Sequence, residues 1–206
     1  MDFIIQKFGG FMERYKIILA SQSPRRKELL ELMGIKKYDV IVSHTDETIQ
    51  ENISIQEKVK KIAYQKAATV FKSTHGNRIV IGADTIVEKN QKIYGKPKDE
   101  KDAIRMLKEF SNSKLTVITA IAVLIEEDGK SITKTDFDLA EVYIKKMTEE
   151  EIKRWINTGE SLDKAGAFAI QGQFCVHIQK INGNYTTMMG LPTHKLYDIL
   201  KEYINF

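Results

Sequence analysis

The alternation of β-type apolar runs with amphipathic helical runs is the feature that most constrains the fold of this chain. Short strands are predicted over 16–20 and 38–42, with a helix over 24–33 between them. Ser54-Ile55-Gln56-Glu57 has the pattern of a capping box and predicts a long helix that ends near Phe71. Helices that alternate with strands are typical of an α/β protein with parallel strand pairs.

The second half of the chain continues this pattern but adds an antiparallel feature, because Glu127-Asp128-Gly129 predicts a hairpin turn between two long strands. The expected elements are a strand over 78–83, a helix capped near Asp99, strands over 115–125 and up to Ile144, a helix after Thr148, a strand over 174–181 and a helix after Pro192. The sequence therefore predicts an α/β fold with a mixed, twisted sheet flanked by helices. With 206 residues, one domain with two lobes around a central cleft is expected over 16–206, and residues 1–15 are interpreted as an N-terminal extension.

The composition excludes several classes of protein. A net charge of +4 is far from the clustered basic excess of a dedicated nucleic-acid binder. Cys175 is the single cysteine, which excludes an intramolecular disulfide and a cysteine-rich zinc site and indicates a reducing compartment, most simply the cytoplasm. No apolar run approaches the roughly 20 residues that cross a membrane, so no membrane association is expected.

The turn between the first strand and the first helix has the composition of an anion site. Ser21 and Ser23 offer hydroxyl groups beside the free backbone N–H groups of a helix N-terminus. Arg25 and Arg26 occupy the first helical turn, where the helix dipole favours acids rather than cations. Two alternatives remain from the residues alone: a solvated basic turn, or a grip for a strongly anionic ligand such as phosphate.

Two further residues are candidates for chemistry in the first half of the chain. Lys66 falls within the apolar stripe of the 55–71 helix, where its ammonium either extends to water or meets a carboxylate or phosphate. Asp84 follows the small residues Gly82 and Ala83 at the expected carboxyl end of a strand, where open α/β sheets bind ligands. An aspartate there can hold a divalent metal or accept a proton from water, although a simple turn or N-cap role is equally compatible with the pattern.

Four other segments carry polar residues in shaped loops. Asp46-Glu47 adds carboxylates after the second strand, and Gly95-Lys96-Pro97 constrains a lysine between glycine and proline. Asp163-Lys164-Ala165-Gly166 and the Gln171 amide belong to a glycine-rich loop, in which Gln171 can pair with the edge of a base. Gly190-Leu191-Pro192 is interpreted as the end of a strand before the last helix. The chain has no GxxxxGK[ST] motif, which excludes a P-loop.

Seven of these motifs, in this order, resemble the Maf family of nucleoside triphosphate pyrophosphatases over nearly the whole chain. The motifs are ASQSPRRKELL, Asp46-Glu47, AYQKA, GADT, GKP, DKAGAFAIQG and GLP. The Ser-Pro-Arg-Arg variant of the first motif resembles the subgroup that acts on dTTP and UTP. Phe168 departs from the usual tyrosine, and Gln173-Phe174-Cys175 departs from a smaller, glycine-bearing stretch, which makes the choice of nucleotide less secure than the chemistry.

The resemblance implies hydrolysis of a nucleoside triphosphate to the monophosphate and pyrophosphate, with Mg²⁺ or Mn²⁺, in a subunit that is often a homodimer. It implies these roles for residues of this chain: Asp84 as proton acceptor, Lys66 and Glu47 as catalytic residues, Glu47 and Asp84 as metal ligands, and Ser21, Arg25, Arg26, Thr85, Lys96 and Gln171 as substrate-binding residues. Two alternatives stay open, a nucleic-acid-binding module and a nucleotide-binding regulator of septum formation with little turnover.

Overall fold

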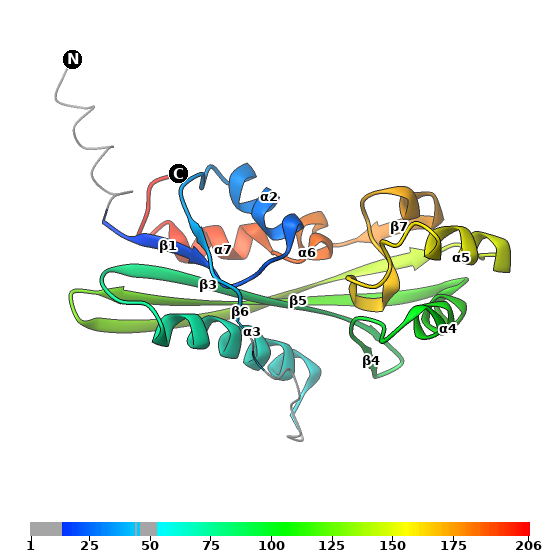
Figure 1. Cartoon of the computed structure of the whole chain (residues 1–206), viewed down its shortest axis with the longest axis horizontal. Helices are drawn as coiled ribbons and strands as arrows, with labels where there is room; N and C mark the ends of the chain where they lie inside the picture. Colours follow the sequence, from blue (N-terminus) through cyan, green and yellow to red (C-terminus); the bar gives the residue numbers. More distant parts are fainter. Residues whose placement is uncertain (1–13, 44, 46–52) are drawn as a thin grey trace, which may run out of the picture. The chain divides into compact units, whose positions relative to one another are not determined.

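The computed structural model of this chain describes residues 14–43, 45 and 53–206 (Figure 1). The described chain forms two compact units. The first consists of the described part of Met1–Asp84 together with Ala120–Phe137 and Gly190–Phe206, and the second consists of Thr85–Thr119 and Asp138–Met189. Three long strands contribute residues to both units: β3 (Arg78–Lys89), β5 (Ser113–Glu127) and β6 (Lys130–Ile144).

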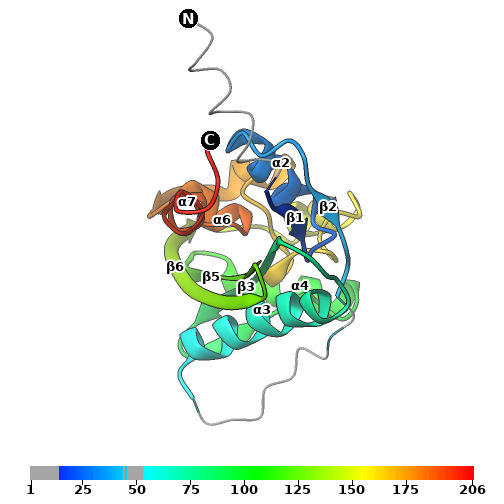
Figure 2. The ribbon, with the colours of Figure 1, turned by 90° about the vertical axis from the view of Figure 1, so that its left-hand side faces the viewer.

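The first unit is a sheet with helices on both faces. Its smaller elements are β1 (Lys16–Leu19), α2 (Pro24–Leu32), β2 (Asp39–Val40), α3 (Ile55–Lys72) and α7 (Thr193–Leu200). Helix α3 covers one face of the strands, whereas α2 and α7 cover the other, as two perpendicular views agree (Figures 1 and 2). The α3 stripe that begins at Val59 and ends at Val70 is buried, as the apolar periodicity of the sequence predicts.

The second unit has its own apolar core. Its further elements are β4 (Lys92–Tyr94), α4 (Glu100–Phe110), α5 (Glu149–Ile156), the 3₁₀ turns η1 (Ala165–Ala167) and η2 (Gln173–His177), β7 (Ile178–Asn182) and α6 (Tyr185–Met189). Aromatic rings dominate this core: Phe110 packs edge-to-face on Phe168, and Trp155 packs in the same manner on Phe174. Phe168 and Phe174, two of the residues that depart from the usual motifs, are therefore core residues of this unit, whereas Gln173 and Cys175 beside Phe174 are exposed.

The sheet is mixed. Its order is β2-β1-β3-β5-β6-β7, and β4 pairs with β3 outside this path. Strand β1 pairs in parallel with both β2 and β3, while β3–β4 and β6–β7 are antiparallel pairs. This arrangement confirms the predicted α/β class with a mixed sheet flanked by helices.

Strand β3 is longer than predicted, and this changes the position of Asp84. The expected strand ends at Ala83, but β3 continues to Lys89, so that Asp84 lies inside a strand rather than at its carboxyl end. The pairing with β1 stops at Ile81 and the pairing with β4 begins only at Val87. Within the described chain, residues 82–86 thus pair with neither β1 nor β4, and Asp84 lies in the middle of this stretch.

The local signals for helix starts and turns are confirmed. The Ser54 hydroxyl accepts a hydrogen bond from the Glu57 amide, and Thr148 forms a complete capping box with Glu151. Asp128 and Gly129, both with positive φ, form the two-residue turn of the β5–β6 hairpin. None of the described helices is both long enough and apolar enough to cross a membrane.

Candidate active site

In the turn between β1 and α2, Ser21 makes the side-chain hydrogen bonds that stabilise the start of the helix, and the N-cap residue does not. Ser23 is the N-cap residue of α2, but its side chain makes no capping bond. Instead the buried Ser21 hydroxyl accepts from the Ser23 amide at 3.3 Å and from Arg26 Nη1 at 3.0 Å. A guanidinium group donates five hydrogen bonds in a rigid plane. The Ser21 contact therefore fixes where the rest of the Arg26 fork points.

A second contact of Arg26 involves the GLP motif. Arg26 Nε donates to the carbonyl oxygen of Gly190 at 2.8 Å, which joins α2 to a segment 164 residues later in the chain. The interpretation of Gly190 as the end of a strand is wrong, because it follows the short helix α6 and has a φ of 100°, which glycine adopts readily. No residue pattern predicts this bond, since its acceptor is a backbone carbonyl group.

Lys66 and Asp84 form a direct ion pair. Lys66 Nζ lies 2.7 Å from Asp84 Oδ1, and the two side chains are only 13% and 8% exposed. The ammonium group therefore does not extend to water, which answers the question that its place in an apolar stripe raises. A buried cation is stable only beside a matching anion. Among the described residues, Lys66 is the one donor to this carboxylate.

Gly82 explains how the helix and the strand approach closely enough for this pair. A β-carbon at Gly82 would lie 2.4 Å from the Ala63 carbonyl oxygen and 2.9 Å from the Ala67 amide nitrogen. Helix α3 therefore rests directly on the backbone of β3, and Lys66 precedes Ala67 on the same helix. The space that the small residues create is filled by α3, so it does not hold a bulky ligand.

The Ser21–Arg26 contact and the Lys66–Asp84 pair involve the neighbouring strands β1 and β3 of the first unit. Leu19 is opposite Ile81 in the parallel β1–β3 pair, and the Ala20 amide donates to the Ile81 carbonyl at 2.8 Å. Ser21 lies two residues after the last β1–β3 pair, and Asp84 lies three residues after it on the neighbouring strand. Ser21 thus follows the carboxyl end of β1, where open α/β sheets bind ligands, whereas Asp84 lies inside β3.

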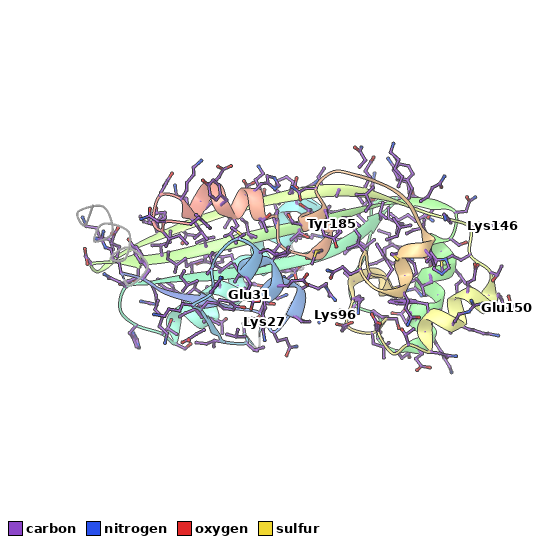
Figure 3. The ribbon with its side chains drawn as sticks, turned by 90° about the horizontal axis from the view of Figure 1, so that it is seen from above. Lys27, Glu31, Lys96, Lys146, Glu150 and Tyr185 are labelled. Carbon is purple, nitrogen blue, oxygen red and sulfur yellow. The ribbon has the colours of Figure 1, made fainter. Side chains whose placement is uncertain are left out.

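The second unit brings two other motifs together. The Gly166 amide donates to the Gly95 carbonyl at 2.9 Å, which ties the DKAG loop to the loop that carries Lys96. Lys96 itself is exposed on this loop (Figure 3). Lys164 is buried and donates to the Glu160 carbonyl at 2.6 Å and to Asp163 Oδ1 at 2.7 Å, so it stabilises its own loop.

The other predicted substrate-binding residues have different surroundings. Thr85 is half-buried, and its hydroxyl lies 3.0 Å from the hydroxyl of Thr119. Arg25 in the first turn of α2 and Gln171 after η1 are also half-buried. Glu47 and its neighbour Asp46 lie outside the described residues. Lys96, Thr85 and Gln171 belong to the second unit, so their roles at one site with Ser21, Arg26, Lys66 and Asp84 stay predictions.

The donor set near Asp84 decides what kind of metal it can hold. No group of three or more His, Cys, Asp or Glu side chains with metal-binding proximity exists among residues 14–43, 45 and 53–206. Hard carboxylate oxygens suit Mg²⁺ or Mn²⁺. Mg²⁺ is commonly held by one or two carboxylates, with substrate phosphates and water as its other ligands. The Asp84 carboxylate fits such an ion.

Comparisons with known proteins find relatives that match nearly the whole chain. A family model described as Maf-like protein matches residues 16–203. A dTTP/UTP pyrophosphatase of Alkaliphilus metalliredigens is 45% identical over 194 residues, which cover 94% of this chain and 98% of the relative. A dTTP/UTP pyrophosphatase of Bacillus pumilus is 43% identical over 188 residues, 91% of this chain and 96% of the relative. A solved HAM1 protein of Coxiella burnetii is 13% identical, with a TM-score of 0.47 and coverages of 91% and 99%. The family match and the two sequence relatives show that this chain belongs to the Maf-like protein family.

Proposed function

We propose that this chain hydrolyses nucleoside triphosphates to the monophosphate and pyrophosphate, with a preference for dTTP and UTP, and thereby removes unwanted pyrimidine nucleotides from the nucleotide pool. The names of the relatives support the reaction and the substrates. The buried Lys66–Asp84 pair is the observation that carries the chemistry, because it fixes a carboxylate beside an ammonium group next to a strand-helix turn suited to anions.

Asp84 acts as the general base. Lys66 donates to Oδ1 and thereby holds the orientation of the carboxylate, while Oδ2 accepts a hydrogen bond from a water molecule. The water oxygen attacks the α-phosphorus as its proton passes to Asp84. The bond from the α-phosphorus to the bridging oxygen breaks, and its electron pair leaves with pyrophosphate. Each atom of water is then accounted for, one hydroxyl on the monophosphate and one proton on Asp84.

Cationic groups offset the charge of the substrate. A triphosphate carries about four negative charges at neutral pH, and Arg26, Lys66 and Lys96 are the cations assigned to it, with Arg25 beside them. Phosphoryl displacement depends mainly on positioning and on electrostatic stabilisation of the equatorial oxygens. Arg26 is suited to this task because Ser21 and Gly190 already hold two of its N–H groups.

A divalent cation completes the proposed site. Asp84 and Glu47 would hold Mg²⁺ or Mn²⁺ together with phosphate oxygens and water, and the bound ion would supply Lewis-acid stabilisation of the developing charge. The cytoplasm is the proposed location, since a single cysteine suits a reducing compartment. A homodimer is also proposed, from the family resemblance, and light scattering on the purified chain tests it.

A nucleotide panel tests the proposed function. Purified chain with added Mg²⁺ or Mn²⁺ is incubated with each canonical ribo- and deoxyribonucleoside triphosphate, and pyrophosphate and orthophosphate are measured separately. Pyrophosphate released fastest from dTTP and UTP supports the proposal. Orthophosphate as the product contradicts attack at the α-phosphorus, and a purine preference contradicts the substrate assignment. Salt-sensitive RNA or DNA binding without hydrolysis favours a nucleic-acid-binding module, and nucleotide binding without turnover favours a regulator.

A further inference from the structure

A chain of hydrogen bonds within the second unit links four side chains, and one of its bonds is made through a backbone carbonyl group. It begins at Thr85 of β3, passes to Thr119 of β5, continues to Thr187 of α6 and ends at Asp138 of β6. Tyr185 marks the start of α6 (Figure 3). Thr119 and Thr187 are fully buried, and burying a hydroxyl group in an apolar core costs free energy unless it is hydrogen-bonded. Valine has the same shape as threonine, so packing alone does not require hydroxyl groups here.

The number of hydroxyl protons decides which of Thr85 and Thr119 donates to the other. A threonine hydroxyl carries one proton and two acceptor lone pairs. Thr119 Oγ1 lies 2.8 Å from the backbone carbonyl oxygen of Thr187, which can only accept, so the Thr119 proton is used there. The 3.0 Å contact between the Thr119 and Thr85 hydroxyls is then a hydrogen bond only if Thr85 donates. The Thr85 proton is therefore used inside the protein, and Thr85 can act toward any other group only as an acceptor.

Asp138, at the far end of this chain of bonds, holds Thr187, whose carbonyl group accepts the Thr119 proton. The Thr187 hydroxyl donates to Asp138 Oδ2 at 2.5 Å, a short bond to an anionic acceptor. Thr187 belongs to a helix of only five residues, so its backbone position depends on such contacts. Asp138 thus holds Thr187, and Thr187 in turn orients the hydroxyl of Thr119.

Because the Thr85 hydroxyl can only accept a further hydrogen bond, it can bind only a part of a nucleotide that carries a hydrogen-bond donor. Phosphate oxygens at neutral pH accept hydrogen bonds and do not donate them, so Thr85 cannot hold the triphosphate. The Watson–Crick edge of uracil and thymine carries one donor, the N3–H group, between two carbonyl oxygens, whereas N3 of cytosine is an acceptor. We propose that Thr119 is a positioning residue for substrate choice: it makes the Thr85 hydroxyl an acceptor for N3–H of uracil or thymine and a poor partner for cytosine.

This inference rests on the proposed function, and Thr119→Val tests it. The variant removes the acceptor for the Thr85 proton and keeps the shape of the side chain, so that Thr85 can rotate and donate to cytosine N3. We expect the ratio of kcat/KM for UTP to that for CTP to fall about tenfold, which corresponds to one net hydrogen bond. Thr119→Ser keeps the hydroxyl group and is expected to retain the ratio of the unmodified chain.

Two further arms separate the outcomes. In a Thr85→Val background, Thr119→Val is expected to change the ratio no further, because it acts through Thr85. If Thr119→Val does not fold, Thr119→Cys, whose thiol is a weak donor and acceptor, is measured in its place with the same expectation. An equal loss for UTP and CTP, or an unchanged ratio, overturns the inference while leaving the proposed function intact. An unmodified chain that releases no pyrophosphate from UTP overturns both.

Discussion

Gly82 is the residue on which the geometry of the Lys66–Asp84 pair depends most directly. The backbone carbonyl of Ala63 would lie 2.4 Å from a β-carbon at this position, and a backbone atom cannot move aside as a flexible side chain does. Any larger residue at Gly82 must therefore push α3 away from β3. Because α3 carries Lys66, a structural substitution in the strand also changes the ion pair.

We predict that Gly82→Ala destabilises the chain by about 2 kcal/mol, the usual cost of overpacking a tightly packed contact. Urea unfolding followed by circular dichroism measures this change. Gly95→Ala is the matched control, because no atom lies within 4 Å of the added β-carbon and the φ of Gly95 is not positive. Equal unfolding midpoints for the two variants would show that α3 does not rest on Gly82.

Asp84 gives a second prediction at the residue scale. Asp84→Asn keeps an oxygen that accepts from Lys66 but removes the base, so we expect the turnover of dTTP or UTP to fall about 10²-fold or more with the circular dichroism spectrum unchanged. Asp136→Asn is the control, since Asp136 belongs to the same unit, and its contacts are a half-exposed pair with Lys195 and a bond from the Phe137 amide that an asparagine oxygen can also accept. A variant at position 84 with full activity would remove Asp84 from the mechanism.

At the scale of elements, Glu109 of α4 holds the short strand β4 against the helix by hydrogen bonds to two β4 side chains. Its carboxylate accepts from Tyr94 Oη at 2.5 Å, from Lys92 Nζ at 3.1 Å and from Arg105 Nη1 at 2.5 Å. These hydrogen bonds, that of Tyr94 foremost, lower the pKa of Glu109 from 4.5 to about 2. The ionised form is thus favoured by the folded chain, and it ties a three-residue strand to the helix behind it.

The lowered pKa of Glu109 predicts a pH-dependent contribution to stability. A group whose pKa is lower in the folded than in the unfolded chain stabilises the fold above its unfolded pKa, and this contribution is lost as the pH falls from 4.5 through about 2. The side chain is one-third exposed, so solvent screening reduces the effect to about 1 kcal/mol at pH 7. Glu109→Gln should cost this amount at pH 7, and the difference from the unmodified chain should shrink between pH 4.5 and 3.

Glu150→Gln provides the control for this measurement. Glu150 is exposed on α5 (Figure 3), and the substitution changes the net charge by the same amount without removing the Tyr94 contact. Urea midpoints at pH 7, 4 and 3 give the comparison for both variants. If the two variants lose equal stability at pH 7, the Glu109 contacts do not hold β4.

Elements with strong local signals were predictable from the sequence. The capping residues Ser54 and Thr148 predict the helices that follow them, and Asp128-Gly129 predicts the hairpin, because these signals involve neighbours in the chain. β4 has only three residues and α6 only five, so neither has enough periodicity to be recognised. The predicted strand over 174–181 begins only at Ile178, because the preceding residues form a 3₁₀ turn that buries Phe174 in the core.

At the scale of the whole molecule, the motifs predict candidate site residues but not how these residues are paired. The Lys66–Asp84 contact joins residues 18 positions apart, and the Arg26–Gly190 contact joins residues 164 positions apart. Such pairs depend on the register of β1 and β3 and on the return of the C-terminal segment to the first unit. Neither is encoded in the local residue pattern. The Thr85–Thr119 bond is not predictable from the sequence either, because a threonine in a strand rich in β-branched residues has no distinctive pattern.

The three strands shared by the two units lead to a prediction about cooperativity. β3, β5 and β6 each run without interruption through residues of both units, so unfolding one unit alone would end three strands in mid-course and leave their backbone groups without partners there. We therefore expect one unfolding transition rather than two.

Trp155, the single tryptophan, is buried in the second unit and reports the unfolding of that unit by fluorescence. A Trp155→Phe, Phe71→Trp variant places the same reporter in the first unit, where Phe71 packs against Arg78. Coincident urea transitions, each referred to circular dichroism of the same variant, support a single cooperative structure, whereas an earlier transition at either reporter would mean that the strands do not couple the two units.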